Sequence, residues 1–221
     1  MTTSVSDILV RVRNLLQDHD GVRWVDDELL RWLNDAQREI VILKPDSYST
    51  RDSAFACAEG TLQTLPADGL QILDVTRNTG TSKRAIRPVS RYILDAENPD
   101  WHGDTPASEV RVFTYDDRAP TSFFVYPPAS AGLSVEILYS VAPPAASLVS
   151  DIALSDIYVG AVVDYIVYRA FSKDAEYAQN LQRAENHYAK FMGSLGLKAG
   201  NEASEGPREQ YNAQYVARGT R

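Results

Sequence analysis

Residues 168–176 read Tyr168-Arg169-Ala170-Phe171-Ser172-Lys173-Asp174-Ala175-Glu176, and they decide the fold because they join two helical patterns. The pattern before this corner, from about residue 155 to 172, is apolar around most of its circumference, which predicts the central helix of a bundle. The pattern after it, from about residue 175 to 196, repeats apolar residues at alternating spacings: Tyr177, Leu181, Ala184, Tyr188, Phe191 and Leu195. The corner is polar, and no group in or near it looks chemically activated. The stretch therefore predicts a helical hairpin built for assembly.

Two further helices are predicted before this hairpin, at about residues 6–18 and 26–44. The first carries an apolar stripe at helical spacing, formed by Val5, Ile8, Leu9, Val12, Leu15 and Leu16. The second carries a narrow apolar seam suited to packing against another helix, formed by Leu29, Leu33, Ala36, Ile40 and Leu43. We expect Asp26 to cap the second helix by accepting hydrogen bonds from its free amides, and Pro45 to end it.

The segment from about residue 54 to 142 shows short apolar runs separated by Gly, Pro and Asn, which indicates antiparallel strands. In the last run, at residues 133–141, apolar and polar side chains alternate. We expect its apolar face to be buried, its polar face with Glu136 and Ser140 to meet solvent or a partner, and residues 123–126 to be its hairpin partner. The predicted fold class is α+β: mainly an α-helical bundle of four long helices, with an inserted small antiparallel β module and an extended C-terminal tail.

The last 25 residues lose all periodicity. Residues 1–196 are predicted to form one domain, and residues 197–221, rich in Gly and polar residues, a flexible C-terminal arm. Apolar bulk near two arginines interrupts the arm, a composition suited to a segment that becomes ordered on a partner. The candidate contact residues are Arg208, Tyr211, Tyr215, Val216 and Arg218.

Composition excludes several classes of protein. The net charge of -8 and the pI near 4.9 argue against a generic nucleic-acid grip, which needs clustered Lys and Arg. The single cysteine, Cys57, excludes an internal disulfide framework and a cysteine-based zinc site, and we expect it to be a small core residue. No apolar run reaches the roughly 18 residues that a spanning helix needs, and residues 1–6 show no export signal, so we expect neither a membrane segment nor secretion.

No catalytic constellation is recognisable in the sequence, and we expect no catalytic, cofactor-binding or metal-binding residues. The three histidines, His19, His102 and His187, stand in separate segments without a catalytic motif; His187 is interpreted as a helix-surface residue. Acid pairs for sugar hydrolysis could come from Glu28 with Asp35 or from Asp164 with Glu185, but nothing selects them.

Two charged residues, Asp164 and Arg169, interrupt the most apolar helix and would be costly to bury unpaired. Arg169 has two interpretations. It bonds Asp174 or the carbonyls at the corner, or it is simply exposed at the edge of the helix.

Four stretches together resemble a family of head–tail adaptor (connector) proteins of tailed bacteriophages, and the resemblance covers roughly residues 5–195. The stretches are Trp24-Val25-Asp26-Asp27-Glu28-Leu29-Leu30-Arg31-Trp32-Leu33-Asn34-Asp35-Ala36-Gln37-Arg38-Glu39; Asn98-Pro99-Asp100-Trp101-His102; Phe123-Phe124-Val125-Tyr126-Pro127-Pro128 with Tyr139-Ser140-Val141-Ala142-Pro143; and residues 168–191. The resemblance implies a ring of twelve copies beneath the dodecameric portal, extending the DNA channel for packaging retention and ejection. It also implies a C-terminal arm that docks on the portal protein, a lower surface that receives a nozzle or tail-tube protein, and no common catalytic site.

The resemblance and the residues together predict a structural virion protein at the head–tail interface, assembled in the host cytoplasm, whose mechanism is binding and not turnover. Genomic DNA would pass through the lumen without specific binding, because an acidic wall repels phosphates. Two alternatives stay open at this point: a tail-associated peptidoglycan hydrolase, which a zymogram would reveal, and a DNA-binding packaging factor, whose affinity would fall steeply with salt.

Overall fold

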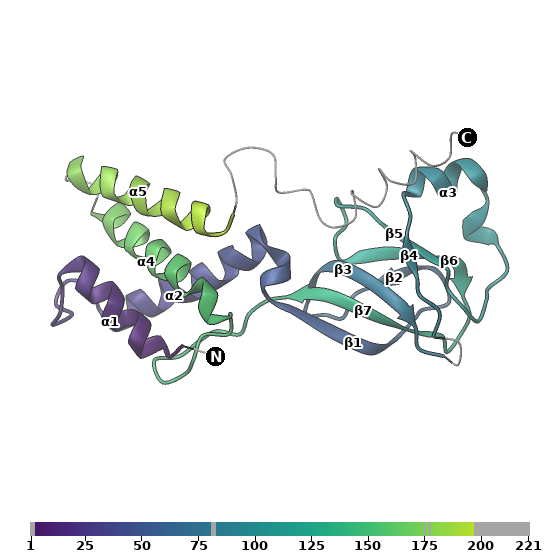
Figure 1. Cartoon of the computed structure of the whole chain (residues 1–221), viewed down its shortest axis with the longest axis horizontal. Helices are drawn as coiled ribbons and strands as arrows, with labels where there is room; N and C mark the ends of the chain where they lie inside the picture. The colour runs from purple at the N-terminus through teal and green to yellow at the C-terminus, as the bar shows by residue number, and fades with distance from the viewer. Residues whose placement is uncertain (1–2, 81–82, 175, 177, 197–221) are drawn as a thin grey trace. The chain divides into compact units, whose positions relative to one another are not determined.

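The computed structural model describes residues 3–80, 83–174, 176 and 178–196 of the chain (Figure 1). These residues form two compact units. The helical unit consists of residues 3–48 and 143–196, and the β unit consists of residues 49–142. The β unit is therefore an insertion in the helical unit, entered and left once by the chain.

The described part of the helical unit contains the helices α1 (Val5–Leu16), α2 (Asp26–Leu43), α4 (Val159–Lys173) and α5 (Ala178–Ser194), with short 3-10 turns η1 (Pro45–Ser47) and η3 (Asp156–Tyr158). Helix α4 packs against α1, α2 and α5, and Figure 1 shows it between α5 and α2. The prediction that this helix is central is confirmed. Its buried side chains join a continuous core with residues of the other three helices, among them Val5, Ile8, Leu9, Val12, Leu29, Leu33, Ala36, Ile40 and Phe191.

The ends of α1 follow from local sequence. The Ser4 hydroxyl accepts a hydrogen bond from the amide of Asp7, so Ser4 caps the helix, and Gln17 at the C-cap adopts the left-handed conformation with φ 56°. The predicted cap of α2 is wrong by one position. Asp26 is the first residue of the helix, preceded by the extended residue Val25, and its carboxylate forms an ion pair with Arg13 instead of binding the helix amides.

The β unit contains two sheets among its described residues. Strands β1 (Ser49–Ala56), β7 (Ser134–Val141) and β3 (Gly69–Asn78) form an antiparallel sheet with β7 in the centre (Figure 1). Strands β2 (Gly60–Thr64), β6 (Ser122–Ala129), β5 (Val112–Tyr115) and β4 (Arg87–Pro88) form the second sheet, in which the short β4 runs parallel to β5. Helix α3 (Arg91–Glu97) and the 3-10 turn η2 (Trp101–Gly103) lie in the chain between β4 and β5.

The two sheets share a core. The rings of Phe55 on β1 and Phe123 on β6 lie 5.9 Å apart between centroids, and the amide of Ile72 on β3 donates to the carbonyl of Pro120, which precedes β6. Ile137 of β7 and Phe113 of β5 are fully buried. Side chains from both sheets therefore contribute to the core of the β unit.

The predicted fold class is wrong in its proportions and in its β topology. The chain is not mainly a bundle of four long helices with a small β module; it is an α+β protein in which a seven-stranded, two-sheet unit occupies residues 49–142 of the described chain. The division into two sheets was missed because β2 and β5 are short and β4 has only two residues. Bulges in β1, β2 and β3 also shift the alternation of side chains, which hides a strand from a period-two pattern.

The predicted partner and exposed face of β7 are also wrong. Residues 123–126 belong to β6, which pairs with β2 and β5 in the other sheet, while β7 pairs with β1 and β3. Glu136 and Ser140, on the face expected to be wet, are buried. Glu136 tolerates this position because Arg51 of β1 and Arg77 of β3 reach it from both sides.

Candidate functional site

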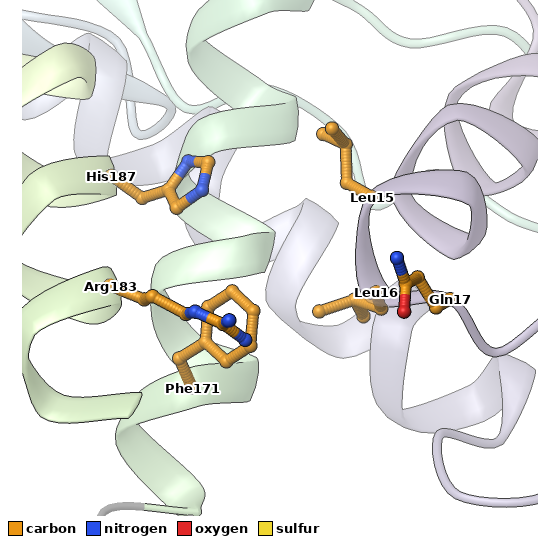
Figure 2. A pocket seen from close by; sticks show the side chains of 6 residues that line it. All are labelled: Leu15, Leu16, Gln17, Phe171, Arg183 and His187. Atoms are coloured by element: carbon orange, nitrogen blue, oxygen red, sulfur yellow. The ribbon is translucent and has the colours of Figure 1, made fainter. Parts of the chain in front are cut away.

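A depression of about 300 Å³ opens on the helical unit where the end of α1 meets α4 and α5. Figure 2 shows the contributions of the three helices: Leu16 points from α1 toward Phe171 of α4, and Arg183 of α5 lies in front of the Phe171 ring. The guanidinium carbon of Arg183 is 5.6 Å from the centre of that ring, within the range of a cation–π contact. The lining residues are Leu15, Leu16, Gln17, Phe171, Arg183 and His187.

His187 forms one wall of the depression, and the prediction that it is a simple surface residue is wrong. Its Nδ1 lies 2.8 Å from Oδ1 of Asp164, and its ring stacks on Phe171 with centroids 6.1 Å apart. A carboxylate can only accept, so Nδ1 carries the hydrogen and Nε2 is left for another partner. Asp164, predicted to need a partner inside an apolar helix, therefore has one on α5 rather than on its own helix.

The second charged residue of that helix, Arg169, uses a partner that neither predicted interpretation named. Its Nη1 lies 3.8 Å from the carboxylate of Asp35 on α2 and 3.2 Å from the hydroxyl of Tyr165, over whose ring the guanidinium lies. Burial raises the pKa of Tyr165, whose hydroxyl accepts the hydrogen bond from Arg169. Asp174, the partner expected for Arg169, pairs with Arg23 instead.

The connection between α1 and α2 is held against the end of α4. Trp24 is buried, with Arg23 5.6 Å and Lys173 5.4 Å from its ring centre, and Lys173 also forms a 2.6 Å ion pair with Glu28. The Asp18 carboxylate accepts amide hydrogens of the connection, of which that of Trp24 lowers its pKa most. These contacts fix the helix ends that surround the depression.

The carboxylates considered for sugar hydrolysis each have a separate partner. Glu28 pairs with Lys173, and Asp35 lies 3.4 Å from Arg38. Asp164 pairs with His187, and Glu185 lies 3.5 Å from the amide of Gln182. The residues that line the depression include no Ser, Cys or Thr that the Asp164–His187 pair could activate as a nucleophile.

The β unit carries two polar constellations of its own. Glu136 is only 5% exposed, and it accepts from Nη1 of Arg51 at 2.6 Å and from Nη2 of Arg77 at 2.9 Å. Hydrogen bonds from Arg77 and then Arg51 lower the pKa of this carboxyl. The triad cross-links all three strands of its sheet and engages both carboxylate oxygens of Glu136.

The second constellation surrounds Trp101, which is fully buried beneath α3. The indole donates to Asp95 at 2.9 Å and stacks on His102 with centroids 3.7 Å apart. The Nδ1 of His102 in turn lies 2.8 Å from the hydroxyl of Thr61 on β2. His102 follows Trp101 in the turn η2, and these contacts indicate a structural role.

Within residues 3–80, 83–174, 176 and 178–196, no group of three or more His, Cys, Asp or Glu side chains could hold a metal ion. A scan against protein-family models finds a match to the model described as SU10 adaptor protein, over residues 3–214. The match covers nearly the whole chain. The chain belongs to the SU10 adaptor protein family.

SU10 adaptor proteins are a phage head–tail adaptor family, so the resemblance found in the sequence is confirmed. Membership indicates a phage adaptor and a structural virion component that interacts with other virion components. A comparison with curated proteins finds no match. Among the described helices, none combines the length and the apolar character needed to cross a bilayer.

The predicted portal-contact residues, Arg208, Tyr211, Tyr215, Val216 and Arg218, lie outside the described residues. Sequence reasoning also missed part of the depression. It assigned Leu15 and Leu16 to a core stripe and gave no role to Gln17. Arg183 belonged to the hairpin motif, but its position over Phe171 depends on how α4 and α5 pack, which the motif alone did not specify.

Proposed function

We propose that this SU10 adaptor protein assembles as a ring of about twelve copies between the portal and the tail, extending the DNA channel for packaging retention and ejection. The observation that carries the proposal is the family match over residues 3–214. The net charge of -8 supports it, because a ring of acidic subunits lets DNA slide through without binding the wall.

The portal contact is proposed to lie in the C-terminal arm. The family match continues to residue 214, so Arg208 and Tyr211 belong to the shared part of the chain, whereas Tyr215, Val216 and Arg218 lie beyond it. Tyrosine and arginine are the residues that most often anchor an interface, since they combine apolar area with directional hydrogen bonds. In a cyclic ring, neighbouring subunits would meet through two different faces of each copy, and a nozzle or tail-tube protein would bind below.

Truncation of the arm tests this proposal. A variant lacking residues 201–221 should keep both folded units, as judged by circular dichroism and tryptophan fluorescence, and should no longer comigrate with the portal protein of the same phage in size-exclusion chromatography. Alanine replacement of Arg208 and Tyr211, and separately of Tyr215 and Arg218, would show which half of the arm binds. Unchanged portal binding after truncation contradicts the assignment of the contact to the arm.

A further inference from the structure

We infer that the depression between α1, α4 and α5 is a docking site for a short segment of another virion protein in which a carboxylate stands next to an apolar side chain. Its volume of about 300 Å³ is at the lower end of ligand pockets, enough for one or two side chains. This inference rests on the proposed function in one respect: the segment is assumed to belong to another protein of the virion.

The carboxylate specificity comes from Arg183. Its side chain is exposed, it stacks on Phe171, and it forms no ion pair with any residue in the described part of the chain. The stacking holds the guanidinium group of Arg183 at the mouth of the depression, which reduces the conformational entropy that this side chain loses when it binds a carboxylate. Arg13, Arg23, Arg38 and Arg169 of the same unit each have a carboxylate within 4.0 Å, whereas Arg11 and Arg31, like Arg183, have none among the described residues. Arg183 differs from Arg11 and Arg31 in its position over Phe171 at the depression.

The apolar specificity comes from Leu15 and Leu16 of α1, on the opposite wall, together with Phe171. Leu15 is 51% exposed although it lies on the apolar stripe of α1, and Leu16 and Phe171 are only partly buried. An apolar side chain placed between Leu16 and Phe171 would cover surface that now contacts water, which favours binding by about 25 cal/mol per Å² of apolar area. A carboxylate on the same segment would then lie within reach of Arg183.

Gln17 adds a polar group on the α1 side of the depression, next to Leu16 (Figure 2). It holds a left-handed backbone, with φ 56°, at a position where helices usually place Gly. Its backbone amide donates to the carbonyl of Arg13, but its side-chain amide has no hydrogen-bond partner among the residues that the structure describes. That side chain, together with Nε2 of His187, can bind the peptide groups of a segment that extends across the depression.

Charge decides between possible occupants. One unpaired arginine is not enough to bind a nucleic-acid backbone, because phosphate binding requires several cations. The net charge of -8 also opposes the binding of nucleic acid. A second copy of the chain is another source of such a segment, and the peptide array described below distinguishes it from a different virion protein. An acidic, partly apolar segment of a different virion protein needs only one cation and an apolar wall.

The experiment measures binding of the full-length protein to an array of overlapping 15-residue peptides from every virion protein of the same phage, this chain included. Each acidic peptide is paired with a copy in which Asp and Glu are replaced by Asn and Gln. We expect the protein to bind peptides with a carboxylate beside Leu, Ile or Phe, and the amide copies to bind at least tenfold more weakly. Arg183→Gln should lose at least tenfold in affinity, and Leu15→Gln severalfold.

Two further variants make the test specific. Arg11→Gln removes an exposed arginine of α1 that does not line the depression, and it should bind like the wild type. Arg183→Glu should reject the acidic peptides and gain affinity for copies in which their acids are replaced by Lys. Equal binding by wild type and Arg183→Gln, binding only of this chain's own peptides, or no binding at millimolar concentration would each overturn the inference. Because no portal assembly is needed, a failure here is distinct from a failure of the ring proposal.

Discussion

Replacing Phe191 with alanine should destabilise the helical unit and leave the stability of the β unit unchanged. Phe191 on α5 is fully buried, and its ring centre lies 5.2 Å from that of Tyr165 and 6.0 Å from that of Tyr188. It belongs to the core that α1, α2 and α4 share. The side chain therefore attaches α5 to the rest of the unit.

The expected loss follows from this burial. Truncating a fully buried Phe costs about 3–5 kcal/mol, because lost apolar burial and the resulting cavity both contribute. With a urea slope of roughly 1.5 kcal/mol per M for a unit of this size, the midpoint of unfolding falls by roughly 2–3 M. Leu181→Ala on the same helix is the matched control. Its side chain is half exposed, so it should cost less than about 1 kcal/mol.

The three tryptophans allow each unit to be followed separately. Trp24 and Trp32 lie in the helical unit and Trp101 in the β unit. In a Trp101→Phe background, urea unfolding followed by fluorescence should show the full effect of Phe191→Ala. In a background with Trp24 and Trp32 replaced by Phe, the Trp101 transition should not move. An equal shift of both transitions would refute independent units, and a loss below about 1 kcal/mol would refute the packing of α5.

Three other predictions follow from single contacts. Glu136→Gln should destabilise the β unit at neutral pH and make its stability less dependent on pH. The pKa of Glu136 is lowered from 4.5 in the folded state, so the contribution of its carboxylate to stability is present above that value and is lost as the pH falls. If unfolding followed by Trp101 fluorescence showed the same pH dependence of stability as in the wild type, this would be disproved. Gly21→Ala should cost about 1–2 kcal/mol, because Gly21 has φ +67° and a Cβ there would lie 2.7 Å from Nη1 of Arg13. Gly160→Ala in α4, where a Cβ would meet open space, should instead stabilise by about 0.5–1 kcal/mol. Thermal melts in which both substitutions changed stability in the same direction would contradict the structure. Cys57 is buried and its pKa is raised to about 11, so at pH 7.5 a thiol reagent should modify the native protein on the order of a hundredfold more slowly than the unfolded chain, and comparable rates would place it at the surface.

The helical stripes could be predicted because helix periodicity is local. Val5, Ile8, Leu9 and Val12 are buried as expected, and the seam of α2 is buried from Leu29 to Ile40. The predictions fail at positions near helix ends and edges. Leu15 and Leu181 fit the stripes but are about half exposed, because no described element covers them. Tyr177 of the predicted stripe lies outside the described residues.

The sheets were predicted less accurately than the helices, because strand pairing depends on residues that are distant in sequence. Phe123 and Val135 lie close in sequence and look like a hairpin, yet they belong to different sheets. Glu136 looks like a solvent-facing residue until Arg51 and Arg77, distant in sequence, are placed beside it. The depression could not be predicted for the same reason, since its lining residues come from three helices that are distant in sequence. The role of the C-terminal arm stays a prediction.

Mass photometry of the purified protein, alone and mixed with the portal protein of the same phage, tests the adaptor proposal most directly. The account predicts that the portal gains the mass of about twelve subunits of 24.5 kDa each, and that the variant lacking residues 201–221 adds none. No added mass from the wild-type protein at any mixing ratio would contradict the proposal that it forms a ring on the portal.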